Sequence, residues 1–76
     1  MIKIDLKLFA TLSKYLPENS ECFGVSDNTT VEKLISDLGI EREVVKLIFV
    51  NGKKQKGSYI LKNQDRVGLF PPVGGG

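Results

Sequence analysis

The residues of this chain best suited to covalent chemistry are its last two, Gly75 and Gly76, which follow the segment Pro71-Pro72-Val73-Gly74. Glycine carries no side chain, so the distinctive group is the carboxylate of Gly76, held on the most permissive backbone available. An α-carboxyl group has a pKa of about 3.5, is ionised at neutral pH and is a poor electrophile until it gains a leaving group. We therefore expect the Gly76 carboxyl to be the reactive group, after activation.

The chain has few side chains of the types that usually act in catalysis or metal binding. Cys22 is the only cysteine and the chain has no histidine, so the usual activation of a nucleophile by imidazole is missing. Structural zinc takes about four cysteine or histidine ligands. We expect no metal site and no conventional nucleophilic catalysis, and we interpret Cys22 as a structural residue, half-buried in a short strand.

Composition narrows the class of protein. Seventy-six residues, 41% hydrophobic and 26% charged, are typical of a single globular domain. No apolar run approaches the ~18 residues of a membrane span, and the first residues alternate charged with apolar side chains, unlike a signal peptide. The net charge is only +2, and no aromatic residue interleaves Lys53, Lys54 and Lys56. We expect a cytoplasmic protein that binds neither nucleic acid nor a membrane.

Two predicted strands frame the chain. Residues 2–8 alternate apolar and charged side chains, and this period of two indicates a strand with one buried face. Residues 66–70 form the second strand, with Val67 and Leu69 on one face and Gly68 and Phe70 on the other. Proline 71 should end the hydrogen bonding of that strand. The glycine end would thus follow directly from a strand of the sheet.

Between these strands the sequence predicts two helices. Phe9, Leu12 and Leu16 have helical spacing up to Pro17 and indicate a short helix. The main helix should begin at a capping box formed by Thr29 and Glu32 and end at Gly39. Its apolar stripe contains Val31, Leu34, Ile35 and Leu38.

The remaining segments predict short strands and turns. Residues 21–25 should form a brief strand and residues 44–50 a central one. Asn51-Gly52 is a strong signal for a tight hairpin turn into residues 53–56. Residues 59–61 should anchor the chain before a turn at residues 63–65. One helix long enough to cover a sheet gives an α+β domain of two layers, which we place at residues 1–72, followed by a flexible tail at residues 73–76.

Three segments carry a resemblance to a known family: Leu8-Phe9-Ala10-Thr11-Leu12, Val50-Asn51-Gly52, and the last twelve residues, Asp65-Arg66-Val67-Gly68-Leu69-Phe70-Pro71-Pro72-Val73-Gly74-Gly75-Gly76. They resemble the small subunit of molybdopterin synthase, within the ubiquitin-like sulfur carriers that also include the thiamin-pathway carriers. The resemblance implies a β-grasp fold, with a mixed sheet of four to five strands packed on one main helix.

The resemblance also implies a function. Such a protein is a non-catalytic carrier without a bound cofactor. An E1-like adenylyltransferase uses ATP to adenylate its terminal glycine, and a persulfide then yields a thiocarboxylate. The large subunit of molybdopterin synthase receives the carrier and passes the sulfur to a pterin precursor. On this chain Gly76 would be the acceptor and Gly75 its diglycine partner.

Docking to those enzymes requires a surface beside the tail. Phe70 is a candidate aromatic anchor, although it could instead cover the edge of the sheet. Leu8 lies near a position where the family has a hydrophobic docking residue, but its alternation with Ile4 and Leu6 fits a core role equally well. Residues Pro71, Pro72, Val73 and Gly74 would contact the partner along the tail.

The acceptor of the sulfur stays open. The stretch Leu69-Phe70-Pro71-Pro72-Val73 favours the pterin pathway, while the thiamin thiazole, a thiolated tRNA nucleotide or cysteine synthesis are alternatives that use the same tail. A ubiquitin-like modifier, joined through Gly76 to a lysine of a target, would have the same end. A plain binding module with inert glycines is the remaining possibility.

Overall fold

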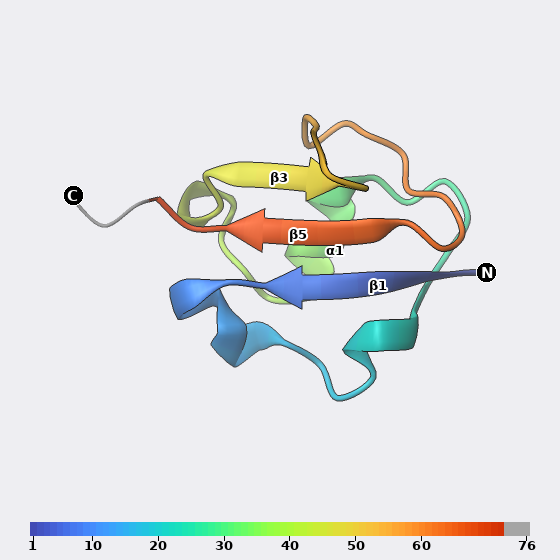
Figure 1. Ribbon diagram of the computed structural model, residues 1–76, viewed down its shortest axis with the longest axis horizontal. Helices are drawn as coiled ribbons and strands as arrows, with labels where there is room; N and C mark the ends of the chain where they lie inside the picture. The colour runs from blue at the N-terminus through green and yellow to red at the C-terminus, as the bar shows by residue number, and fades with distance from the viewer. Residues whose placement is uncertain (73–76) are drawn as a thin grey trace.

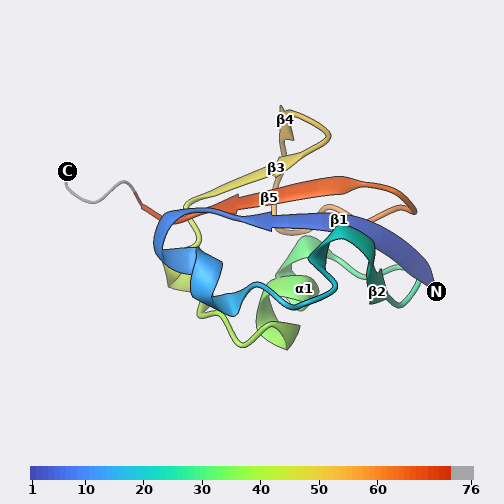
Figure 2. The same ribbon diagram turned by 60° about the horizontal axis from the view of Figure 1, so that its bottom comes forward.

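The computed structural model describes residues 1–72, in which a sheet and one α-helix form two layers (Figures 1 and 2). The five strands lie in the order β2-β1-β5-β3-β4. Their bounds are β1 (Ile2–Leu8), β2 (Phe23–Val25), β3 (Leu47–Val50), β4 (Lys53–Lys54) and β5 (Arg66–Phe70). The α-helix is α1 (Val31–Asp37), and three short 3₁₀ helices are η1 (Ala10–Tyr15), η2 (Ser20–Cys22) and η3 (Arg42–Val44). The predicted sheet on one main helix is confirmed.

The last strand of the sequence is the central strand of the sheet. β5 pairs in parallel with β1, where Leu6 lies opposite Val67. It pairs antiparallel with β3, where Ile48 lies opposite Leu69. β5 therefore joins the N-terminal strands to the β3–β4 hairpin, and Figure 1 shows it lying between β1 and β3.

A single core fills the space between the sheet and α1. The predicted alternation is confirmed in β1, because Ile4, Leu6 and Leu8 are buried while Lys3 and Lys7 are exposed. The helix contributes Val31, Leu34 and Ile35, each no more than 1% exposed. Burial of such a side chain contributes ~1.5 to 3 kcal/mol, so the apolar stripe of α1 fixes the helix against the sheet. None of the helices in the described part of the chain is long and apolar enough to cross a membrane.

The start of α1 differs from the prediction by one residue. Thr30, and not Thr29, is the N-cap, and its hydroxyl oxygen accepts a hydrogen bond from the backbone N–H of Lys33. Thr29 is buried and donates its hydroxyl to the carbonyl of Ser26 at 2.6 Å. The predicted capping box of Thr29 with Glu32 is therefore wrong, because the preceding turn uses the hydroxyl of Thr29.

Two predicted turns are confirmed by their backbone angles. Gly39 follows α1 with φ of +79°, the left-handed conformation that ends helices. Asn51 and Gly52 have φ of +55° and +82° between β3 and β4, as a two-residue hairpin turn requires.

Three short segments differ from the sequence prediction. The helix predicted from Phe9 is the 3₁₀ helix η1, which starts at Ala10; Leu12 is buried but Leu16 is 42% exposed. The strand predicted over residues 21–25 is limited to β2, since the N–H of Cys22 donates to the carbonyl of Asn19 and cannot join the ladder. Cys22 thus ends η2 and is exposed, so its assignment as a half-buried strand residue is wrong.

The strand predicted over residues 44–50 starts only at Leu47. Residues 42–44 form η3, and the N–H of Val45 donates to the carbonyl of Arg42. The predicted anchor at residues 59–61 is confirmed, because Leu61 is buried and its N–H donates to the carbonyl of Thr29 at 2.8 Å. This segment holds the start of α1 close to the loop that leads into β5.

Candidate functional site

The face of the sheet opposite α1 is the candidate site. In Figure 2, α1 and the 3₁₀ helices lie on one side of β1, β5 and β3, and none of the described helices covers the other side. We call this other side the outer face. It is formed by the alternate side chains of the strands that do not enter the core.

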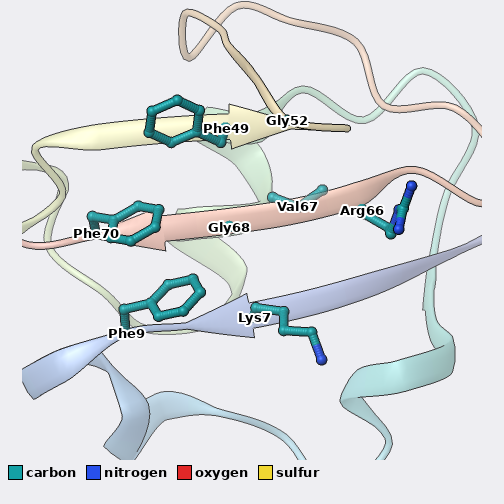
Figure 3. A pocket seen from close by; sticks show the side chains of 8 residues that line it. All are labelled: Lys7, Phe9, Phe49, Gly52, Arg66, Val67, Gly68 and Phe70. Atoms are coloured by element: carbon teal, nitrogen blue, oxygen red, sulfur yellow. The ribbon is translucent and has the colours of Figure 1, made fainter.

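Strand register arranges the outer face in rows. Leu8 lies opposite Leu69, so the next residues, Phe9 and Phe70, are neighbours at the end where β5 finishes. Two residues before Phe70 on β5, Gly68 lies between Lys7 of β1 and Phe49 of β3. Figure 3 shows the three phenylalanine rings gathered toward one end, with Lys7 and Arg66 nearer the other.

The aromatic rings contact one another. Phe9 and Phe70 stack with their centroids 4.2 Å apart and their planes at 3°. Phe49 meets Phe70 edge to face, with the centroids 5.5 Å apart and an angle of 82° between the rings. Phe9 remains 39% exposed, while Phe49 and Phe70 are half-buried. An apolar cluster of this kind on a protein surface is typical of a protein contact site.

The outer face is hollowed beside these rings. An open hollow of about 310 Å³ is lined by the three rings together with Lys7, Arg66, Val67, Gly68 and Gly52. Its size lies at the lower limit of small-molecule pockets, ~300 Å³. The arrangement can accept an apolar group laid against the sheet.

The tail leaves the sheet at the aromatic end of this face. The carbonyl of Phe70 accepts a hydrogen bond from the N–H of Lys46 at 2.7 Å, the last contact of β5 with its neighbour. Pro71 is half-buried and Pro72 is exposed. The root of the tail is therefore fixed by the same residue, Phe70, that carries the central ring of the cluster.

The opposite end of β5 is fixed by a buried carboxylate. Asp65, 4% exposed, accepts hydrogen bonds from the side-chain amide of Asn51 at 2.9 Å, the N–H of Lys62 at 2.8 Å and the Tyr59 hydroxyl at 3.2 Å. The amide oxygen of Asn51 accepts in turn from the N–H of Arg66. The hairpin turn and the start of β5 are thus held together by one network.

Tyr59 is the group whose acidity this network alters. Burial, followed by the charge of Asp65 and the hydrogen bond to it, raises the pKa of Tyr59 above its usual value of 10.0. Both the low polarity and the neighbouring carboxylate disfavour a phenolate. Tyr59 is therefore a neutral donor within the network.

The predicted site residues fall in three places. Phe70 lies on the outer face and Pro71 and Pro72 lie at the tail root. Leu8 is only 7% exposed and belongs to the core, so of its two interpretations the structure supports the core role. Val73, Gly74, Gly75 and Gly76 lie outside the described residues. No cluster of potential metal ligands occurs within residues 1–72.

Two residues of the aromatic cluster were missed by sequence reasoning. Helical spacing assigns Phe9 to a short helix, and Phe49 belongs to the central strand predicted over residues 44–50, for which no exposed face was predicted. The signal that could have found Phe9 is its position one residue after the alternating run, because continuing the alternation past Leu8 places it beside Lys7 on the outer face.

Within residues 1–72, the order of the strands and the one α-helix packed on the sheet define a β-grasp protein of the ubiquitin-like class. The model of the ThiS family matches residues 6–76, so the chain belongs to this family of small ubiquitin-like sulfur carriers. Members of the family are carriers that work with an E1-like enzyme and with further partner enzymes. No curated protein sequence matches the chain significantly.

Solved structures share the whole fold. A protein of Pyrococcus furiosus, provisionally named molybdopterin converting factor subunit 1, is 26% identical with a TM-score of 0.74, and the match covers 96% of this chain and 100% of that one. The small archaeal modifier protein 1 of H. volcanii is 19% identical with a TM-score of 0.73, over 96% and 100% of the two chains. The Haloferax volcanii HVO 2177 protein is 24% identical, with a TM-score of 0.76 over 99% and 87%. The last two likenesses show the fold alone.

Proposed function

We propose that this chain is the sulfur-carrying small subunit of a molybdopterin synthase, whose Gly76 carboxyl becomes a thiocarboxylate during molybdenum or tungsten cofactor synthesis. The observation that carries the proposal is the family match, which extends to residue 76 and so includes Gly75 and Gly76. The supporting geometry is the root of the tail, since Pro71 and Pro72 follow β5 directly at the aromatic end of the outer face.

The chemistry divides between the chain and its partners. The E1-like adenylyltransferase would transfer AMP from ATP to a carboxylate oxygen of Gly76, with release of pyrophosphate. A persulfide sulfur would then attack the carbonyl carbon and expel AMP, and a thiol would cleave the sulfur–sulfur bond, leaving the thiocarboxylate on the chain and a disulfide on the partner. ATP belongs to the partner, and the chain binds no cofactor of its own in this scheme.

The tail residues suit delivery into an enzyme. Six residues beyond Phe70 reach at most about 20 Å, at ~3.3 to 3.6 Å each. Glycines at positions 74–76 carry no β-carbons that would clash in a narrow passage. Pro71 and Pro72 restrict the backbone at the root of the tail, which lowers the entropy lost on insertion.

Partner contacts would surround this tail. Phe70 is the proposed anchor on the domain, and Pro71, Pro72, Val73 and Gly74 would contact the active-site channel of each enzyme. The pterin pathway is favoured by the Leu69-Phe70-Pro71-Pro72-Val73 stretch and by the 26% identity to the Pyrococcus furiosus protein. The large subunit of molybdopterin synthase is the partner that would complete the enzyme.

The proposal is tested by the intact mass of the protein. After incubation with its E1-like enzyme, ATP and a persulfide source, the mass should change by the exchange of one oxygen for one sulfur at Gly76. The chain without Gly75 and Gly76 is the control and should keep its original mass. An unchanged carboxylate mass with every family activator would count against the proposal.

The acceptor is tested separately. The thiocarboxylated chain, mixed with the large subunit of molybdopterin synthase and a pterin precursor, should return to the carboxylate mass as sulfur is transferred. Transfer only to a thiazole, tRNA or cysteine-forming system would assign it to those pathways instead. A ladder of conjugates in extracts, absent without Gly75 and Gly76, would instead indicate a protein modifier.

A further inference from the structure

The dipeptide Asn51-Gly52, which forms the turn between β3 and β4, contains two groups that can react with each other. The backbone nitrogen of the residue that follows an asparagine can attack the side-chain carbonyl carbon, Cγ, and a following residue without a β-carbon hinders this attack least. Gly52 is such a residue. The other asparagines each precede a residue that carries a β-carbon; they are Asn19, Asn28 and Asn63. In an unfolded chain we therefore expect Asn51 to react first.

The surroundings of the turn leave room for this reaction. Asn51 and Gly52 are both exposed. A β-carbon at Gly52 would meet no atom of residues 1–72 within 4 Å, its chain neighbours aside. Water, which completes the reaction, therefore has access to both residues.

The side-chain amide of Asn51 is, however, engaged at both ends. Its Nδ2 donates to Oδ1 of Asp65 at 2.9 Å, and its Oδ1 accepts from the backbone N–H of Arg66, also at 2.9 Å. Attack at Cγ converts the planar amide into a tetrahedral centre and then expels Nδ2. The reaction gives up both hydrogen bonds, so the folded state should resist it.

The acceptor of the Asn51 amide is itself fixed in place. Asp65 is 4% exposed, and its Oδ2 accepts hydrogen bonds from the N–H of Lys62 and the hydroxyl of Tyr59. A buried carboxylate that loses a donor is costly, and members of one network support one another. The intact network therefore keeps the Asn51 amide in its hydrogen-bonded position.

We propose that Asn51 is a deamidation site, that its hydrogen bonds to Asp65 and Arg66 hold the reaction back in the folded protein, and that the product detaches the β3–β4 turn from β5. The nitrogen of Gly52 bonds to Cγ of Asn51, the bond from Cγ to Nδ2 breaks, and ammonia leaves with the proton of the Gly52 N–H. The resulting succinimide takes up one water molecule. Cleavage of the ring at Cγ gives aspartate, and cleavage at the backbone carbonyl carbon gives isoaspartate. This inference does not depend on the proposed function.

The product should disrupt the network. Both isomers carry a carboxylate at residue 51 and lack the Nδ2 donor, so a second negative charge lies next to buried Asp65 and the two repel each other. Isoaspartate also adds one carbon to the backbone of a two-residue turn. As the side chain moves away from Asp65, the N–H of Arg66 loses its acceptor.

The reaction is located by peptide mapping of the full-length chain with mass spectrometry during several weeks at neutral pH, because exchange of the amide NH2 for OH changes the mass of one peptide. The folded chain is compared with the chain unfolded in guanidinium chloride. In denaturant Asn51 should react about tenfold or more faster than Asn63, which precedes Gln64. Folding should slow the reaction at Asn51 by about tenfold or more, because its hydrogen bonds must open first.

Two variants separate the network from general stability. Tyr59→Phe removes one donor of Asp65 and should speed deamidation of the folded chain at Asn51 by about fivefold. Phe23→Ala is the matched control, because Phe23 is half-buried on β2 and has no part in the network. It should leave the rate at Asn51 within about twofold if the turn opens locally. Where a variant does not fold, the comparison of folded and unfolded chain decides.

The consequence is measured on the deamidated chain, prepared in denaturant, refolded and separated by ion exchange. Hydrogen exchange at the Arg66 amide should be about tenfold or more faster than in the unmodified chain. The control is the Phe9 amide, which donates to the carbonyl of Leu69 at the other end of β5 and should keep its protection.

Several results would overturn the inference. Equal rates at Asn51 and Asn63 in the unfolded chain would remove the site, and equal rates at Asn51 in the folded and unfolded chain would remove the protection. Equal acceleration by Tyr59→Phe and Phe23→Ala would assign the protection to general stability. Unchanged exchange at Arg66 after deamidation would contradict the detachment of the turn. The proposed function is unaffected by these outcomes, since it is tested by the thiocarboxylate mass at Gly76.

Discussion

Phe70 links the sheet, the aromatic cluster and the tail through a single residue. Its carbonyl makes the last hydrogen bond of β5, and its ring packs between Phe9 and Phe49. Its neighbour Pro71 already lies outside the strand. A change in the Phe70 side chain therefore alters the surface beside the tail while the backbone contacts of β5 remain.

We expect Phe70→Ala to reduce stability only modestly and docking strongly. Loss of the stacked and edge-to-face contacts should cost about 1 to 2 kcal/mol, less than the ~3 to 5 kcal/mol of a fully buried phenylalanine. Urea unfolding and binding to the activating enzyme measure the two effects. The matched control is Phe23→Ala, since Phe23 is half-buried on β2, away from the tail. A loss of about 3 to 5 kcal/mol in the unfolding free energy of Phe70→Ala would assign Phe70 to the core.

Tyr59 gives the fold a dependence on alkaline pH. Its pKa is raised in the folded state, so its contribution to stability is fully present below the unfolded value of about 10 and is lost as pH rises through the folded value. Tyr59→Phe should cost about 1 kcal/mol at neutral pH through the lost hydrogen bond to Asp65. It should also flatten the alkaline loss of unfolding free energy.

The measurement is urea unfolding of the unmodified chain and of Tyr59→Phe from neutral to alkaline pH. The difference between the two proteins isolates the contribution of Tyr59. Tyr15→Phe serves as the control because Tyr15 makes none of the hydrogen bonds to the Asp65 side chain within residues 1–72. Parallel pH curves for wild type and Tyr59→Phe would contradict the prediction.

At the level of elements, the β3–β4 turn and the start of β5 behave as one unit. Asn51 supplies the left-handed residue of the turn and also donates to Asp65 and accepts from Arg66. The turn signal was visible in the sequence because Asn-Gly has a strong local preference. The hydrogen bonds of Asn51 to Asp65 and Arg66 could not be predicted from the sequence, because they depend on the pairing of β3 with β5.

We expect Asn51→Asp to cost more than about 2 kcal/mol at neutral pH, since it places a second carboxylate against buried Asp65 in place of a donor. Asn51→Gly keeps the left-handed turn accessible and loses only the side-chain hydrogen bonds, so it should cost less. Chemical denaturation of both variants gives the comparison. Equal losses would show that the turn conformation, and not the link to Asp65, sets the effect.

Some strands and turns could be predicted correctly from sequence patterns alone. β1 and β5 were predicted with their observed bounds because strict alternation reflects a sheet with one buried face. Gly39 and Asn51-Gly52 were predicted because local backbone strain selects the residue type. In contrast, Cys22 and Thr29 lie in short segments where a turn with a few competing hydrogen bonds decides the structure. Intrinsic secondary-structure propensities are too weak to predict which of these competing hydrogen bonds forms.

The candidate face required the strand order as well. Phe9 and Phe70 are far apart in the sequence and become stacked only because β1 and β5 are parallel neighbours. The same pairing directs Leu8 into the core, so a position near a family docking residue did not determine its face. Sequence reasoning could therefore predict one member of the cluster, Phe70, without the residues that complete it.

At the scale of the whole molecule, the fold and the tail should be separable. Every core residue in the described part of the chain lies between Ile4 and Leu69. We expect a chain ending at Pro72 to unfold within about 0.5 kcal/mol of the full chain, the range of changes made outside the packed structure, and to accept no sulfur. Thermal unfolding and intact mass test the two statements. A large loss of stability would place the domain boundary beyond residue 72.

The central position of β5 also sets the order of events during synthesis. Until residues 66–70 have emerged from the ribosome, β1 has no partner on one side and the β3–β4 hairpin has no connection to it. Bringing together segments so distant in the chain costs loop-closure entropy that only the finished sheet offsets. The sheet, and with it the outer face, therefore forms only after residues 66–70 have emerged. A protein that recognises the outer face then meets it only in chains whose last strand has already left the ribosome.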